Sequence, residues 1–103
     1  MDKKTILETV NRYKDAVVKE FSPYKVVLFG SYAKGTADEN SDIDVGILFD
    51  GFDGDYLKGV QRLWSIANDV SWDIEPHLLD IRNDKSGFAK YIDQTGQEIY
   101  SVQ

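Results

Sequence analysis

Residues 26–45 read VVLFGSYAKGTADENSDIDV, and the order of apolar and polar positions in this segment predicts the centre of the fold. The apolar run Tyr24–Phe29 is short and rich in valine, which is typical of a buried strand. Gly30-Ser31 ends this strand, Tyr32–Lys34 can form one helical turn closed by Gly35, and the polar residues 36–41 indicate a loop. A second apolar run, Asp42–Phe49, predicts the next strand.

Helices and strands are expected to alternate on both sides of this segment. Apolar residues recur at helical spacing over about residues 3–20 and 57–70, which predicts two long helices, and Ser22-Pro23 should end the first. Trp72–Leu79 predicts a third strand, in which Pro76 favours an edge position or a bulge. A final helix is indicated by Phe88, Tyr91, Ile92 and Ile99. We therefore expect one domain over residues 1–103, of α+β class with α/β-like alternation, in which helices back a small sheet.

Composition narrows the classes of function. The chain has 103 residues and a net charge of -6, which disfavours direct binding of nucleic acid, because phosphate contacts need clustered lysine and arginine. It has no cysteine, so disulfides and thiolate metal sites are excluded, and a reducing cytoplasm is the expected location. No apolar run is long enough to span a membrane, and we expect no signal peptide.

Asp42 and Asp44 are the first candidate site residues. On a strand, residues two apart share a face, so both carboxylates should lie on one surface while Ile43, Val45 and Ile47 fill the other. Adjacent like charges repel unless a cation lies between them. Mg²⁺ prefers carboxylate, water and phosphate oxygens, and two such ions can hold both oxygens of a phosphoryl or nucleotidyl displacement. An isolated Asp-x-Asp pair is more often a solvated strand edge or loop.

Gly30 and Ser31 are candidates for binding phosphate. A glycine after a buried strand lets the backbone approach a ligand closely, and the following turn presents N–H groups and a hydroxyl. Taken alone, such a pair is usually only a turn. Lys34 adds a nearby positive charge. Ser41 is a further nucleotide-binding candidate, although a hydroxyl before Asp42 could instead serve as a cap or turn residue.

The third predicted strand offers the remaining acidic ligand. Asp73 and Glu75 should share a face, with Ile74 on the other, and we place Glu75 ahead of Asp73 as the third carboxylate. His77 should lie on the same face as these acids. A surface or phosphate-facing role is expected for this histidine rather than metal binding. The strand could also simply have one polar face.

The residues Val27–Thr36 followed by Ser41–Val45 resemble the G-S-x10-D-x-D signature of the polymerase-β-like nucleotidyltransferase superfamily, most closely its minimal single-domain members. The resemblance implies a small mixed sheet packed against helices. It also implies transfer of a nucleoside monophosphate, with AMP expected, from ATP or another nucleoside triphosphate to a hydroxyl, with Mg²⁺ as cofactor. In the family motif the glycine and serine hold the triphosphate, and the two aspartates bind metal. A third acidic residue, here Glu75 or Asp73, completes the site and can act as general base.

Minimal members of the superfamily also resemble the antitoxin half of a two-gene module whose partner is an all-helical HEPN-domain protein. The resemblance implies that the acceptor is a tyrosine of such a partner. The small size of the domain, with no visible acceptor domain, leaves a partner, a second copy or an extension that this chain lacks to bind the acceptor. A second hypothesis is a weakly catalytic or non-catalytic binding module that uses Phe52, Tyr56, Trp64 or Trp72 as its interface. A third is an acidic domain with no nucleotide role.

Overall fold

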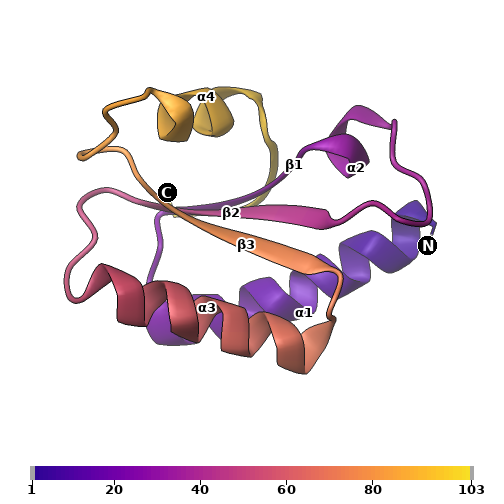
Figure 1. Cartoon of the computed structure of the whole chain (residues 1–103), viewed down its shortest axis with the longest axis horizontal. Coiled ribbons are helices and arrows are strands. Elements are labelled where there is room, and N and C mark those ends of the chain that lie inside the picture. Colours follow the sequence, from indigo (N-terminus) through magenta and orange to yellow (C-terminus); the bar gives the residue numbers. More distant parts are fainter. Residues whose placement is uncertain (1, 103) are drawn as a thin grey trace.

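The structure is a computed structural model of the chain, and it describes residues 2–102 (Figure 1). Along the chain the elements are α1 (Lys3–Phe21), β1 (Lys25–Phe29), α2 (Ser31–Lys34), β2 (Ile43–Phe49), α3 (Tyr56–Val70), β3 (Ile74–Asp80), α4 (Phe88–Thr95) and β4 (Gln97–Ser101). The four strands form one sheet in the order β3-β2-β1-β4. The expected α+β class, with a small mixed sheet packed against helices, is confirmed.

The sheet is mixed, with one parallel pair of strands and two antiparallel pairs. β1 is antiparallel to both β2 and β4, whereas β2 and β3 are parallel and joined by the crossover through α3. A parallel pair needs such a crossover, and a helix usually provides it. β3 lies at one edge of the sheet, where the missing N–H of Pro76 is tolerated. Of the two expectations for Pro76, an edge position or a bulge, the edge position is the one that the structure shows.

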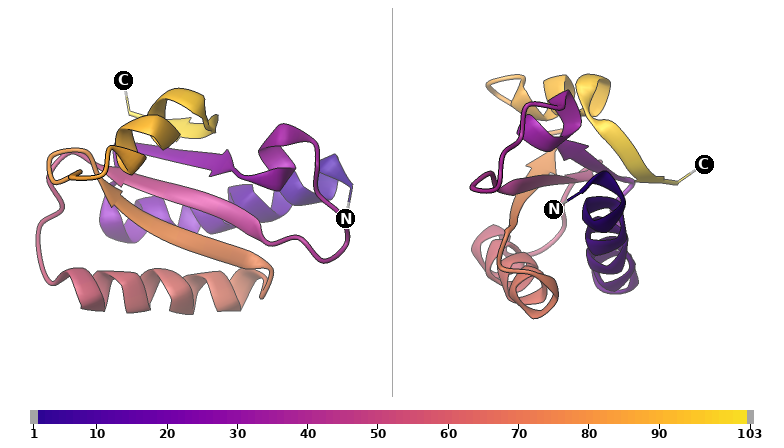
Figure 2. Two further views of the ribbon diagram at one scale, coloured as in Figure 1. Left: turned by 45° about the horizontal axis from the view of Figure 1, so that its top comes forward. Right: turned by 90° about the vertical axis from the view of Figure 1, so that its right-hand side faces the viewer.

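Helices cover both faces of the sheet. The two long helices α1 and α3 lie side by side against one face, and α2 and α4 lie on the other (Figures 1 and 2). The main core lies under α1 and α3, where the large fully buried side chains include Tyr13, Ile43, Ile47 and Leu63. A smaller core of Val27, Leu48 and Ile92 lies beneath α4. Each layer therefore buries one face of the sheet, and the α2/α4 layer is the thinner one.

The ends of α1 match the sequence prediction. Its N-cap is Asp2, whose carboxylate accepts a hydrogen bond from the backbone N–H of Thr5 at 2.8 Å. At the other end Ser22 adopts a left-handed conformation with φ 54° before Pro23.

None of the helices formed by residues 2–102 has both the length and the apolar composition that crossing a membrane requires.

The C-terminal part of the chain differs from the sequence prediction. α4 ends at Thr95, and residues 97–101 pair with β1 as the fourth strand, so assigning Ile99 to the final helix was wrong. The helix ends because the chain passes directly over β1 at Gly96. A Cβ at this position would lie 2.9 Å from the carbonyl oxygen of Ile92 and 2.9 Å from Cβ of Val27.

Candidate functional site

The side chains of Asp44, Glu75 and His77 converge on the sheet face that carries α2 and α4. Their ligand atoms, two carboxylate oxygens and one imidazole nitrogen, all lie within 4.8 Å of one another. Nε2 of His77 lies 3.3 Å from Oδ1 of Asp44. All three residues are half-buried, so the cluster is held by the protein and still reached by solvent.

The parallel register of β2 and β3 produces this convergence. Asp44 is opposite Glu75, and His77 follows two residues later on the same face of β3. Ile43, Val45 and Ile47 alternate with these polar positions and are fully buried against α1 and α3. The alternation predicted for β2 is seen at Asp44, whereas Asp42 precedes the strand and is not among the residues that converge.

The electrostatics of Glu75 show that negative charge is concentrated at this point. Partial burial raises the pKa of Glu75 above its usual range, and the charge of Asp44 raises it further. His77 opposes the rise, and Asp42 adds to it. Asp42 is exposed and lies one residue before β2, which begins at Ile43. The charges of both aspartates thus act on Glu75, as expected for acids gathered around one site.

Gly30 brings the backbone directly against the cluster. It has φ 75° and ψ -152°, a conformation that favours glycine, and a Cβ here would collide with Oδ2 of Asp44. Ser31 then begins α2, whose first-turn N–H groups have no partner within the helix. The order of a strand, a glycine and one helical turn is the one predicted from residues 26–35, and it places these N–H groups beside the acids.

The other candidates lie in different surroundings. Ser41 forms a turn in the loop before β2, where its Oγ accepts a hydrogen bond from the N–H of Asp38 at 3.0 Å. This is the turn role that the sequence left open. Asp73 is exposed and precedes β3, and it is not among the residues that converge. Of the two alternatives, Glu75 is therefore the one that the structure brings to Asp44.

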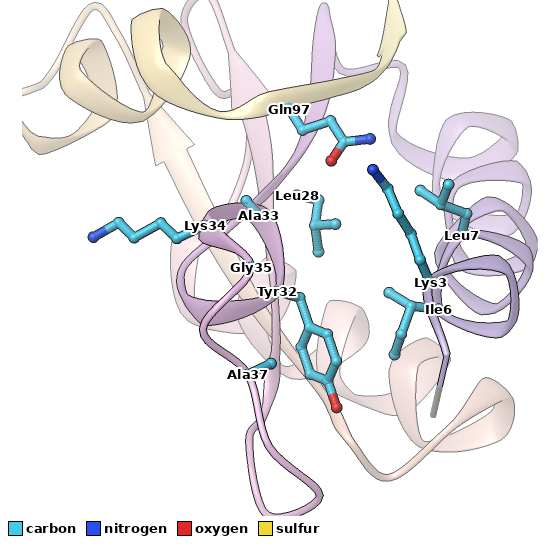
Figure 3. A pocket seen from close by; sticks show the side chains of 10 residues that line it. All are labelled: Lys3, Ile6, Leu7, Leu28, Tyr32, Ala33, Lys34, Gly35, Ala37 and Gln97. Carbon is cyan, nitrogen blue, oxygen red and sulfur yellow. The ribbon is translucent and has the colours of Figure 1, made fainter.

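Lys34 ends α2 and lies between two cavities. In the pocket between α1 and α2, Lys3 extends towards Gln97, whereas the side chain of Lys34 points away from the pocket (Figure 3). Lys34 also lines a cleft of about 250 Å³ between α2 and α4, together with Gly30 and Phe88. This cleft adjoins the acid cluster through Gly30, so a ligand has room beside the cluster.

Sequence reasoning underestimated His77. Its ring packs edge-on against Phe29, with centroids 4.9 Å apart and planes at 62°, and its Nε2 is near the Asp44 carboxylate. The signal was present in the sequence, because His77 shares a face with Glu75. What the sequence lacked was the register that brings this face next to Asp44.

The donor set fits a divalent cation. Two carboxylates supply the oxygen ligands that Mg²⁺ prefers, the charge of Asp42 acts nearby, and the backbone at Gly30 leaves no side chain in the way. Acids that repel each other in this way are stabilised when a cation binds between them. The imidazole of His77 is an addition that an all-oxygen Mg²⁺ site does not need.

Comparison with known proteins supports this interpretation. The model of the nucleotidyltransferase domain family matches residues 10–98. A protein adenylyltransferase, MntA, from Shewanella oneidensis is 30% identical over 80 residues, which cover 76% of this chain and 54% of that protein. A second relative is a Methanocaldococcus jannaschii protein that is assigned as a protein adenylyltransferase. It is 32% identical over 100 residues, which cover 95% of this chain and 97% of that protein. The chain thus spans about half of the first relative and nearly all of the second.

Solved structures share the fold. A Sulfolobus solfataricus protein assigned as a nucleotidyltransferase superposes with a TM-score of 0.67 at 19% identity, covering 94% of this chain and 81% of that chain. A toxin–antitoxin crystallised with AMP-PNP gives a TM-score of 0.58 at 26% identity, covering 90% of this chain and 74% of that chain. The match of the family model over most of the chain, together with the second relative's nearly full-length similarity, shows that the chain belongs to the nucleotidyltransferase domain family.

Proposed function

We propose that this chain transfers a nucleoside monophosphate, with AMP as the expected group, from a nucleoside triphosphate to a hydroxyl in a reaction that depends on Mg²⁺ or a similar divalent cation. The observation that carries the proposal is the convergence of Asp44 and Glu75 beside the close-lying backbone of Gly30. Acids that can hold cations then lie next to a turn that can hold phosphates. Both are required for transfer from a triphosphate.

Each residue has a defined role in this proposal. Asp42, Asp44 and Glu75 would hold the cations, of which we expect two, and these would supply positive charge beside the phosphates. Gly30, Ser31 and the first-turn N–H groups of α2 hold the β- and γ-phosphates. The acceptor oxygen attacks the α-phosphorus, the bond to pyrophosphate breaks, and the hydroxyl proton moves to a base.

Glu75 is our candidate for this base. It is the one of the two acids considered for this role that the structure brings to Asp44, so it lies where the acceptor hydroxyl would be positioned. Lys34 lines the adjoining cleft and is our candidate for a further phosphate contact. Most of the catalysis would come from positioning and charge neutralisation, as in phosphoryl transfer generally.

We further propose that the acceptor is a tyrosine of a partner protein, of the all-helical HEPN type, in the cytoplasm. One curated relative is named as a protein adenylyltransferase, the other is assigned as one, and one similar structure is a toxin–antitoxin with AMP-PNP. The cleft between α2 and α4 also fits this role, because among residues 2–102 it leaves space beside Gly30 for an acceptor carried by another molecule. A second copy of the chain is the alternative source of the acceptor.

The test is transfer of label from α-labelled ATP to the protein encoded by the neighbouring gene, which we expect to be of the HEPN type. We expect label on the partner with the wild type, and a loss of at least about 100-fold in rate for Asp44→Asn and Glu75→Gln. Asp73→Asn is the matched control, because it removes an exposed carboxylate outside the cluster and should retain the rate. Equal rates for Asp44→Asn and Asp73→Asn would refute the proposed site.

A binding module that neutralises its partner by contact is the second candidate. It is favoured by exposed apolar side chains at both ends of α3: Trp72 is 87% exposed, Leu57 70% and Tyr56 55%. Phe52 does not belong to this surface, because its ring packs against Phe49 with centroids 4.9 Å apart. Tight binding of the partner by Asp44→Asn, with no label transfer by the wild type, would favour the binding module over the enzyme.

A further inference from the structure

His77 gives the acid cluster a nitrogen donor. The imidazole lies in the same 4.8 Å group as the carboxylates of Asp44 and Glu75, and its Nε2 lies 3.3 Å from Oδ1 of Asp44. The side chains of His77 and Asp44 are 29% and 23% exposed, so a cation from solvent can reach both. Two carboxylate oxygens and one imidazole nitrogen form a three-donor set that leaves coordination positions for phosphate oxygens.

The packing around His77 fixes the direction in which this nitrogen points. Phe29 contacts the ring edge-on from β1, with centroids 4.9 Å apart, and Phe29 itself packs against Phe88 of α4 at 6.0 Å. This aromatic contact holds the ring between β1 and β3 while Nε2 faces Asp44 on β2. An imidazole oriented in this way needs little rearrangement to bind a cation together with its neighbours.

An imidazole nitrogen affects the binding of Mg²⁺ and of divalent transition-metal ions differently. Mg²⁺ binds oxygen and keeps much of its water, so an imidazole adds little to its affinity. Transition-metal ions such as Mn²⁺ and Co²⁺ bind imidazole, and their affinity for mixed nitrogen and oxygen sites rises along the series. The residue at position 77 should therefore determine how strongly the site distinguishes these ions from Mg²⁺.

We propose that His77 Nε2 is a metal ligand together with Asp44 and Glu75, and that it makes this site prefer divalent transition-metal ions over Mg²⁺. The inference rests on the proposed function for the presence of a cation at the cluster. Mg²⁺ still binds through the carboxylates, so Mg²⁺-dependent transfer remains compatible with it. What His77 adds is selectivity between cations.

The experiment uses the full chain without a histidine tag. His77 is the only histidine in the sequence, so any imidazole nitrogen bound to Mn²⁺ must come from it. Pulsed electron paramagnetic resonance of the Mn²⁺-bound protein, prepared with natural and with ¹⁵N-labelled histidine, reports this bond directly. We expect a nitrogen coupling that changes with the isotope, and its absence would overturn the proposal.

Affinity provides the second measurement. Titration with Mn²⁺ alone and with Mg²⁺ alone should show that His77→Gln weakens Mn²⁺ binding by about 10-fold or more, while Mg²⁺ binding changes by less than about 3-fold. Asp73→Asn should leave both affinities unchanged, since Asp73 is not part of the cluster. Equal losses for both cations in His77→Gln would contradict the selectivity. If this variant does not fold, the isotope experiment on the wild type decides alone.

The outcomes separate this inference from the proposed function. Nitrogen coupling without label transfer would support His77 as a ligand and refute the transferase. Label transfer without nitrogen coupling would refute the role of His77 and leave the transferase intact.

Discussion

Gly30 is the residue at which the backbone comes closest to the acid cluster, and two separate constraints keep it a glycine. Its φ of 75° with ψ of -152° is strained for any other residue, and a Cβ would collide with the Asp44 carboxylate. Gly35 offers a comparison, because it has φ 77° but no atom within 4 Å of a Cβ. Backbone strain is common to both positions, whereas contact with the site exists only at Gly30.

Gly30→Ala is therefore predicted to impair the site more than it impairs the fold. Both Gly30→Ala and Gly35→Ala should lower stability, by about 1–3 kcal/mol each, because a non-glycine residue is strained in these conformations. Only Gly30→Ala should also lose the thermal stabilisation by Mn²⁺ or Mg²⁺, since it pushes Asp44 aside. Melting curves with and without the cation measure both effects. Equal cation responses in the two variants would contradict this prediction.

Glu75 gives a pH-dependent prediction. Its pKa is raised on folding, so the folded chain binds this proton more tightly than the unfolded chain, and stability falls as pH rises from the ordinary value of 4.5 through the folded value. In the cation-free protein, Glu75→Gln should thus be more stable than the wild type at pH 7–8. Because solvent screens this half-buried group, we expect a gain of about 2–4 °C in Tm that shrinks towards pH 5.

Melting curves in a chelator between pH 5 and pH 8 test this prediction. Asp73→Asn controls for the loss of one negative charge at the start of the same strand. The stabilising effect of Glu75→Gln should grow with pH more steeply than that of the control. A difference in Tm between Glu75→Gln and the wild type that stays constant over this range would show that folding does not raise the pKa of Glu75.

At the scale of elements, the sequence predicted those segments whose signal is local and repeated. α1 and α3 extend over several turns, so their apolar faces recur often enough to be recognised. β1 and β2 are short, mostly apolar and mostly buried. β4 has five residues of which none is buried, and it is a strand only because it pairs with β1. Long-range pairing of this kind leaves no periodic pattern to detect.

The same reasoning explains what the sequence could predict of the site. The strand period placed Asp44 on the face opposite Ile43 and Val45, and the structure agrees. The choice between Glu75 and Asp73 depended on the register of a parallel pair formed across α3, which a local pattern does not contain. His77 was underestimated for the same reason.

A substitution at Gly96 would test how tightly β4 packs against the rest of the sheet. It has an ordinary φ of -70°, so the only obstacle to a side chain is the 2.9 Å approach to Cβ of Val27 and to the carbonyl of Ile92. These atoms belong to the buried strand and to the helix backbone and cannot move aside. Gly96→Ala should therefore destabilise the chain by about 1–3 kcal/mol, measured by urea unfolding.

Gly54→Ala is a suitable control for this prediction, because no atom lies within 4 Å of a Cβ there and its effect reports only the strain of a φ of 110°. Metal binding should be retained in both variants, since neither glycine contacts the cluster. Full stability of Gly96→Ala would mean that α4 and β4 can separate from β1 without loss, and that β4 contributes little to the fold.

At the scale of the whole molecule, the charge of the domain controls its use of a nucleotide. A chain of net charge -6 repels a triphosphate, and the acids nearest the proposed phosphate site, Asp44 and Glu75, add to this repulsion. One divalent cation at the cluster balances the charges of Asp44 and Glu75, and two exceed the charges of Asp42, Asp44 and Glu75 together. The cation should therefore be needed already for binding of the nucleotide, and not only for the transfer reaction.

Removal of the cation should thus abolish nucleotide binding. With Mg²⁺ or Mn²⁺ present, ATP at about 100 times its dissociation constant should stabilise the chain by about 2.7 kcal/mol, which raises Tm by roughly 10–20 °C in a domain of this size. In a chelator the same ATP should give no shift. Asp42→Asn should lose most of the shift with the cation present, while Asp53→Asn, in the exposed loop before α3, should retain it. An undiminished ATP shift in the chelator would mean that the nucleotide binds away from the acids, and the proposed transferase site would then be wrong even though the fold is shared.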